Sequence, residues 1–188
     1  PQLSAEDWPT FRHDASRSGV IGQSLASRLH LQWVRHLPQP RPAWDNQKEV
    51  YCYGGPPKRV EQKCSFDIAY EPVAAGSTVV IGSPNNDRVT AYALGSGSER
   101  WRFYTDGPVR FAPALAHGRV YVSCDDGRLY CLDLRNGTLV WQRELALTGR
   151  MVLGNDRLIS AWPVRGAPVV VDEERGPVVY CAAGLYSF

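Results

Sequence analysis

A unit of about 40 residues occurs twice in this chain, and this repeat constrains the fold more than any other feature of the sequence. The two copies are AGSTVVIGSPNNDRVTAYALGSGSERW at 75–101 and HGRVYVSCDDGRLYCLDLRNGTLVW at 117–141. Each copy has two short apolar runs around a polar turn and ends in a lone Trp, Trp101 or Trp141. A small residue and a glycine recur before each Trp: Ala91 and Gly97, Cys131 and Gly137. A period of this length indicates similar units that stack on one another.

Two further stretches match parts of the unit. LHLQWVRHL at 29–37 matches its Trp-bearing end around Trp33, and APVVVDEERGPVVYCAAG at 167–184 matches its beginning. The chain therefore holds the end of one unit, two whole units and the start of another.

Each whole unit predicts four short strands, which in the second copy are roughly 113–116, 119–124, 128–134 and 138–145. Asp126-Gly127 favours a two-residue hairpin turn between the middle strands. Pairing outward from that turn assigns four residues to each face of the sheet: Val122, Cys124, Leu129 and Cys131 on one, and Tyr121, Ser123, Tyr130 and Leu132 on the other. Neither face alternates with polar residues, so we expect both faces to be covered.

A four-stranded antiparallel sheet that recurs at this period and is covered on both faces predicts an all-β fold, the β-propeller. The alternative is an immunoglobulin-like or other β-sandwich, against which the Trp spacing and the glycine before each Trp argue. Trp33, Trp101 and Trp141 are then expected to fill the wedges between adjacent blades, where so large a ring is well buried.

The expected organisation is a partial propeller of about two and a half to three blades. Its parts are an N-terminal segment with the last strand of a blade at 1–37, an inserted loop at 38–70, blades at 71–105 and 112–146, an insertion at 147–166 and the start of a blade at 167–188. Open sheet edges and faces predict that this chain by itself is poorly soluble or self-associates, and that a longer chain supplies the remaining blades.

Composition narrows the function classes. The net charge is only +2 and the basic residues are scattered, so we expect no nucleic-acid partner. No apolar stretch approaches the roughly 18 residues of a spanning helix, so we expect no membrane span. The five cysteines contain no CxxC pair, which argues against zinc. Cys52 and Cys64 flank a Pro- and Gly-rich loop and could close it as a disulfide or remain free; Cys124, Cys131 and Cys181 are expected to be small buried residues.

The ends of the two units, ALGSGSERW and CLDLRNGTLVW, resemble the Trp-docking repeat of the pyrroloquinoline quinone (PQQ)-like β-propeller family, which includes BamB-like and quinoprotein alcohol dehydrogenase-like proteins. The matching positions are Ala91, Gly97 and Trp101 in the first unit, and Asp133, Gly137 and Trp141 in the second. The first unit carries Ala93 where the repeat has Asp. The opening DWPTFRHDASRSG at 7–19 is similar to the N-terminal segment of the same family.

The resemblance implies two kinds of function, and the residues favour the non-catalytic one. PQQ dehydrogenases of this fold use an adjacent Cys-Cys pair, a calcium-binding set and an Asp base. This chain has no adjacent cysteines. Its clustered turn residues, Asn85, Asn86, Asp87, Asp125 and Asp126, are types expected in hairpin turns anyway. We therefore predict no catalytic residue, metal or cofactor here, with PQQ and calcium bound by residues outside this segment as the alternative. His13 and Asp14 are interpreted as structural.

The resulting hypothesis is a non-catalytic scaffold in the periplasm or another extracytoplasmic compartment, which binds a protein or a small ligand. In repeat proteins, insertions gather on one face, often the binding face. The two insertions, 38–70 and 147–166, are thus expected to carry the recognition surface. The candidate residues are Trp44, Tyr51, Tyr53 and Trp162. The alternative is that these side chains only pack their own loops.

Overall fold

The computed structural model describes residues 3–4, 7–24, 26–40, 69–154 and 157–184, and the backbone of 49–50 and 58–59. Its main elements are two four-stranded antiparallel sheets, each of which follows chain order. The first sheet comprises β3 (Val73–Ala75), β4 (Thr78–Ser83), β5 (Arg88–Ala93) and β6 (Glu99–Tyr104). The second comprises β7 (Ala114–Ala116), β8 (Arg119–Ser123), β9 (Arg128–Asp133) and β10 (Leu139–Glu144). The all-β fold and the four strands of each repeat are confirmed.

Three short hairpins accompany the two sheets. They are β1 (Glu49–Val50) with β2 (Lys58–Arg59), β11 (Met151–Gly154) with β12 (Arg157–Ser160), and β13 (Val169–Glu173) with β14 (Gly176–Tyr180). Among the residues described, none forms a helix long and apolar enough to cross a membrane.

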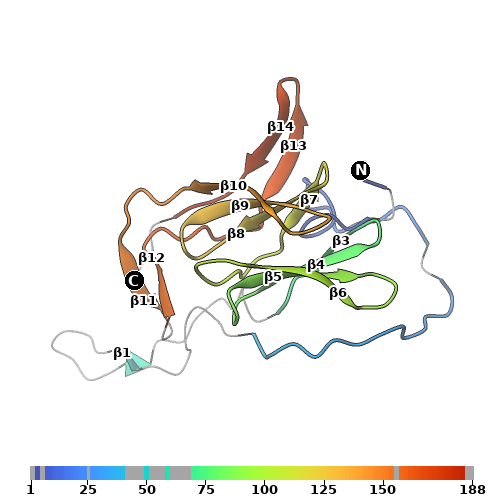
Figure 1. Cartoon of the computed structure of the whole chain (residues 1–188), viewed down its shortest axis with the longest axis horizontal. Helices are drawn as coiled ribbons and strands as arrows, with labels where there is room; N and C mark the ends of the chain where they lie inside the picture. The colour runs from blue at the N-terminus through green and yellow to red at the C-terminus, as the bar shows by residue number, and fades with distance from the viewer. Residues whose placement is uncertain are drawn as a thin grey trace.

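The two four-stranded sheets stack face to face, and the β13–β14 hairpin stands out beyond the second sheet (Figure 1). The core between the sheets is built from apolar side chains of both, including Val80, Val89, Trp101, Val120 and Leu132. The other face of the second sheet packs its own cluster, Ala114, Ala116, Tyr121 and Cys131, against Val170 and Val179 of the hairpin. Because β7 lies beside both β3 and β13, three successive units meet along their innermost strands, as blades do around a propeller axis.

The register of the second sheet differs by one residue from the prediction. Val122 pairs with Tyr130 and Tyr121 pairs with Cys131, so the predicted assignment of Leu129 and Cys131 to the Val122 face was wrong. The hairpin loop has three residues, because Asp125 belongs to the turn and Gly127 takes φ +88°. A slip of one residue exchanges the two faces of a strand. Tyr130 and Leu132 therefore enter the core between the sheets.

The repeated Trp and Gly meet between adjacent units. The indole Nε1 of Trp101 donates to the carbonyl of Leu134 at 2.9 Å, and a Cβ placed on Gly137 would lie 2.5 Å from Cε3 of that indole. The preceding pair has the same geometry. Trp33 Nε1 donates to the Leu94 carbonyl at 2.7 Å, and a Cβ on Gly97 would lie 2.6 Å from the Trp33 ring. In each of the two whole units a glycine thus contacts the Trp of the preceding unit. Trp141, at the end of the second whole unit, is 36% exposed, so its expected burial was wrong.

The segment at 29–37 carries Trp33 but pairs with no strand of the described chain. It runs extended, with Leu29 and Leu31 largely exposed. Arg35 lies over the Tyr92 ring and donates from Nε to the Gly97 carbonyl at 2.7 Å. The segment therefore lies on the first sheet through Trp33 and Arg35, much as β6 lies on the second sheet through Trp101.

We expect Gly137→Ala to lower the free energy of unfolding by about 2 kcal/mol. Gly137 has φ +72°, a conformation that costs an L-residue roughly 1–2 kcal/mol, and the added methyl group also collides with the indole. Gly95→Ala is the matched control, because nothing lies within 4 Å of a Cβ there, and its effect should stay within about 0.5 kcal/mol. Urea unfolding of the longest soluble form of the protein measures both. Equal effects of the two variants would contradict the docking role of Gly137.

Candidate functional site

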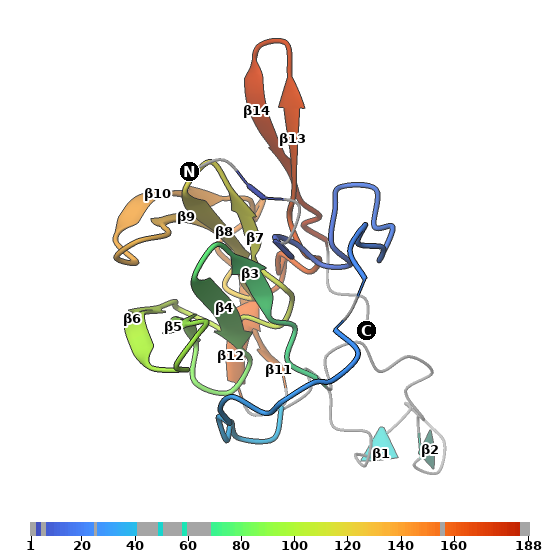
Figure 2. The ribbon, with the colours of Figure 1, turned by 90° about the vertical axis from the view of Figure 1, so that its right-hand side faces the viewer.

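The N-terminal segment crosses the innermost strands of all three units (Figure 2). Trp8 forms a two-way backbone bridge with Ala74 of β3. The Pro9 carbonyl accepts from the Leu115 amide of β7 at 2.7 Å. Arg17 donates to the Ala167 carbonyl, just before β13, at 2.8 Å. These hydrogen bonds, three between backbone groups and one from the Arg17 side chain, hold the segment in place and make it one wall of a pocket.

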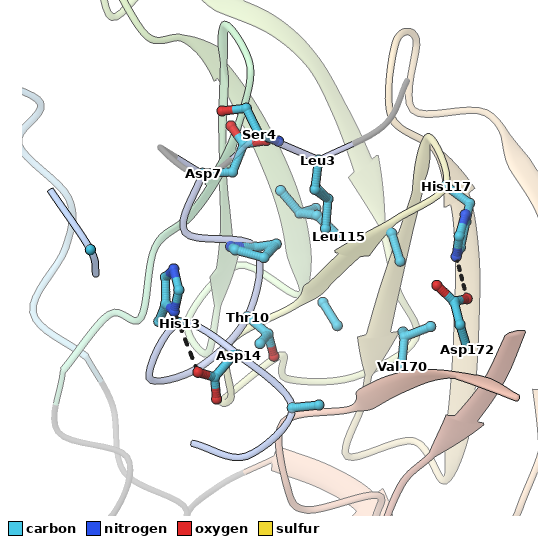
Figure 3. A pocket seen from close by; sticks show the side chains of 15 residues that line it. Leu3, Ser4, Asp7, Thr10, His13, Asp14, Leu115, His117, Val170 and Asp172 are labelled. Carbon is cyan, nitrogen blue, oxygen red and sulfur yellow. Dashed lines mark hydrogen bonds and ion pairs between the residues drawn. The ribbon is translucent and has the colours of Figure 1, made fainter. Parts of the chain in front are cut away.

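The pocket has a volume of about 470 Å³ and lies between the N-terminal segment and strands β7 and β13 (Figure 3). Side chains on three sides include Leu115, Val170 and Thr10. The carboxylates that line it are each bonded within the chain. Asp7 accepts from the Gly76 amide at 2.6 Å, and Asp172 Oδ1 lies 2.7 Å from His117 Nε2, with which it forms a side-chain pair. These groups therefore hold the walls of the pocket together.

His13 and Asp14 form the second histidine–carboxylate pair of the pocket. His13 Nδ1 lies 3.5 Å from Asp14 Oδ2, and its ring meets the Trp8 ring edge-on at 5.2 Å. Asp14 also accepts from the amide of Ser18 at 3.0 Å and from the hydroxyl of Ser18. These hydrogen bonds from Ser18 lower the pKa of Asp14 to about 2. The carboxylate thus closes a turn in which Arg12, His13 and Arg17 have positive φ, the structural role expected from the sequence.

Asp14 should make the turn sensitive to acid. Its pKa of about 2 lies below the ordinary 3.8, so its stabilising contribution is complete above the ordinary value and is lost as the pH falls through the folded one. An NMR titration of the Asp14 carboxyl should give a midpoint near 2, and Ser18→Ala should raise it toward the ordinary value. A native midpoint that Ser18→Ala leaves unmoved would argue against the role of Ser18.

A buried charge cluster lies where the connections between the units meet. The Asp125 carboxylate accepts from Arg110 Nε at 2.6 Å and from Arg165 Nε at 3.1 Å and Nη2 at 3.0 Å. The Asp125 and Arg110 side chains are only 1% and 2% exposed. The Asp125 amide also donates to the Pro108 carbonyl, and its carbonyl accepts from Ser160. One residue therefore joins the turn of the second sheet, the connection at 105–112 and the end of the β11–β12 hairpin.

The insertion at 147–166, which the sequence predicted to carry part of the recognition surface, contains the β11–β12 hairpin. That hairpin is fixed to both sheets. Ile159 is fully buried. Arg157 reaches back to the first sheet, where it pairs with Asp87 and donates to the Asn85 carbonyl at 2.8 Å. Burial raises the pKa of Asp87, and Arg157 opposes that shift. The hairpin is therefore a rigid part of the molecule.

The outward face of this hairpin is apolar. Leu153 is 72% exposed and Leu158 is 62% exposed, and these two residues are direct cross-strand partners. Met151 on the same face is also exposed. Sequence analysis missed these residues, although apolar residues on both sides of Gly-Asn-Asp in MVLGNDRLIS are a hairpin signal.

The turn residues around the buried cluster do not fit the calcium set of a PQQ site. Asp125 is paired with two arginines and Asp87 with Arg157. Asp126 accepts from the Arg128 amide and the Tyr130 hydroxyl. Carboxylates neutralised by guanidinium groups are poor ligands for a hard cation, which needs several free anionic oxygens. These turn residues therefore do not form a calcium site that could support a bound PQQ.

The predicted recognition and disulfide residues divide into two groups. Trp162 is half-buried, and its amide donates to the Ser160 hydroxyl at 3.0 Å at the base of the hairpin. The others lie outside the described residues: Trp44, Tyr51, Tyr53, Cys52 and Cys64.

The three remaining cysteines are free. Cys124 and Cys131 are buried thiols, and burial raises the pKa of Cys131 to about 11. Cys181 is only half-buried, so its expected full burial was wrong.

Comparisons of the sequence with known proteins agree on one family. The family described as "Outer membrane protein assembly factor BamB" matches residues 38–183. The assembly factor BamB of Yersinia pestis is 30% identical over 131 residues, which cover 62% of this chain and 31% of that protein. The BamB of Salmonella typhimurium is 29% identical over 98 residues, which cover 46% of this chain and 25% of that protein. This chain thus matches about a quarter to a third of the length of these relatives.

Solved structures establish the fold. The quinohemoprotein alcohol dehydrogenase of Comamonas testosteroni superposes with a TM-score of 0.56 at 19% identity, covering 88% of this chain and 22% of that protein. The likeness at this identity concerns the fold alone. It confirms the partial β-propeller predicted from the repeat.

Proposed function

We propose that this chain, which belongs to the family of the outer membrane protein assembly factor BamB, is part of a non-catalytic β-propeller scaffold that binds a partner protein outside the cytoplasm. Its relatives are named outer membrane protein assembly factors, which supports both the compartment and a role in holding other proteins. The blades supply a rigid frame, and the inserted segments supply the recognition surface.

The observation that carries this proposal is the fixed apolar hairpin. Leu153 and Leu158 are 72% and 62% exposed, although the hairpin that holds them is anchored by buried Ile159 and by the pairing of Arg157 with Asp87. Apolar side chains that gather on a rigid, exposed element favour protein recognition. A preorganised surface also loses little conformational entropy when it binds.

Site-specific photo-crosslinking in the full-length protein tests the proposal. With a benzophenone amino acid at Leu158, we expect a discrete adduct with one partner protein in cells. The matched control is the same probe at Leu94, which is 44% exposed and follows β5 at the end of the strand opposite the Asp87 turn that Arg157 contacts. The absence of a discrete adduct at Leu158, or the same adduct at both positions, would refute the scaffold proposal.

The alternative, a PQQ-dependent oxidoreductase, predicts a different result in a titration of the full-length protein with PQQ and calcium. The non-catalytic proposal predicts no saturable, calcium-dependent quenching of tryptophan fluorescence, and within this segment the carboxylates of Asp87 and Asp125 are already paired with arginines. The control repeats the titration with the calcium chelated. Calcium-dependent quenching that saturates at micromolar PQQ would overturn the non-catalytic assignment and make an alcohol-oxidation assay the next step.

A further inference from the structure

The backbone of the β11–β12 hairpin has one paired edge and one open edge. The Ala161 amide donates to the Arg150 carbonyl at 2.8 Å, so the hydrogen-bonded pairs of this ladder alternate from that point. Backbone groups then point away from the partner strand at alternate residues: Met151 and Leu153 on β11, and Leu158 and Ser160 on β12. The Ser160 amide does so, since it donates to the Asp125 carbonyl at 2.8 Å.

The two edges therefore face different surroundings. The edge of β12 lies against the turn of the second sheet through Ser160 and Asp125. The edge of β11 is the outer side of the hairpin, at one end of the stack (Figure 1). In the described part of the chain, β11 pairs with β12 alone. The backbone groups of Met151 and Leu153 thus remain available to another strand.

This open edge lacks three of the devices that usually prevent pairing, namely a charged residue, a proline and a bulge. Exposed edge strands are commonly blunted by charged residues, proline or a bulge. β11 is Met-Val-Leu-Gly, with no charge and no proline, and its register with β12 is regular over all four residues. Its outward side chains, Met151 and Leu153, share the exposed apolar face with Leu158.

The charge at the start of the edge indicates what kind of strand fits. Arg150 immediately precedes β11 and is exposed. Among the described residues it takes part in no ion pair, whereas Arg157 of the same hairpin is paired with Asp87. An antiparallel strand added to β11 would place its C-terminal end beside Arg150. A carboxylate at that end would complement the guanidinium, and alternating apolar side chains would cover Leu153 and Leu158.

We propose that β11 receives an extended segment of the partner protein as a third, antiparallel strand, and that this segment is apolar at alternate positions and ends in a carboxylate. This inference rests on the proposed scaffold function and specifies how the hairpin is used. Main-chain hydrogen bonds to Met151 and Leu153 would supply affinity, and the apolar face and Arg150 would select the sequence.

The test uses the full-length protein and a synthetic eight-residue peptide in which Val and Thr alternate and the last residue is a free carboxylate. We expect fluorescence anisotropy of the labelled peptide to saturate, and hydrogen exchange at the Met151 and Leu153 amides to slow at least tenfold when the peptide is bound. Two peptides serve as controls. One is N-methylated at alternate residues on the edge that would face β11, and the other has a C-terminal amide; both should bind at least fivefold more weakly.

Three outcomes would overturn the inference: no saturable binding, binding that the N-methylated peptide reproduces, or binding without slower exchange at Met151 and Leu153. The Leu158 crosslink separates this failure from failure of the scaffold proposal. A partner adduct at Leu158 without strand addition would leave the scaffold in place and show that the partner docks by side chains alone. Saturable binding of the peptide to Arg150→Ala with unchanged affinity would refute the carboxylate requirement.

Discussion

Trp101→Ala is expected to lower the free energy of unfolding by about 3–5 kcal/mol, the range for removing a buried aromatic side chain. The indole is 7% exposed, lies against Gly137 and donates to the buried carbonyl of Leu134. The substitution leaves a cavity between the two sheets and removes the hydrogen-bond donor of that carbonyl. Urea unfolding of the longest soluble form of the protein, followed by circular dichroism, measures the loss.

The matched control for this variant is Tyr104→Ala. Tyr104 lies on the same strand, β6, but its side chain is 60% exposed, so the expected loss is below about 1 kcal/mol. A Trp101→Ala effect no larger than that of the control would show that the repeated Trp does not hold adjacent units together.

Asp125→Ala is the second large expected effect, again about 3–5 kcal/mol, because it removes one member of a buried ion pair. The Arg110 side chain is only 2% exposed and pairs with Asp125 at 2.6 Å. The loss of Asp125 also removes its two hydrogen bonds with Arg165, which lies in the segment after the β11–β12 hairpin. We therefore expect lower global stability together with faster hydrogen exchange at β12.

Two comparisons isolate the cause of the Asp125 effect. Glu99→Ala breaks a surface ion pair with Arg102, whose side chain is 46% exposed, and should cost only about 0.5 kcal/mol. The double variant Asp125→Ala, Arg110→Met also removes the buried charge of Arg110 and should recover part of the loss. If the double variant is as unstable as Asp125→Ala, the buried charge of Arg110 is not the cause.

The repeat allowed the sequence to predict the blades, because each blade is a local unit. Four strands of three to six residues and their turns lie within one period, and each strand pairs mainly with its neighbour in the chain. The glycine before each Trp is equally visible in the sequence. Its positive φ is a property of a single turn, whereas the indole that it meets comes from the preceding unit.

The register of the second sheet could not be predicted in the same way. Asp126-Gly127 favoured a two-residue turn, but Asp125 joins the loop, and its carboxylate meets Arg110 and Arg165 there. These arginines lie 15 and 40 residues away in the chain. A contact over such distances decides the turn without leaving a local pattern, and the slip of one residue moved Tyr130 and Leu132 into the core.

The proposed recognition surface was likewise predictable only in part from the sequence. The sequence by itself determined the repeating blades, the Trp–Gly positions and the place of the insertion, because these depend on local periodicity and turn chemistry. Only the tertiary structure decided that the insertion is a hairpin fixed by Arg157 to a turn 70 residues earlier, with Leu153 and Leu158 outward and the β11 edge open. The face that a hairpin exposes depends on what its opposite face packs against. Here the opposite face packs against both sheets.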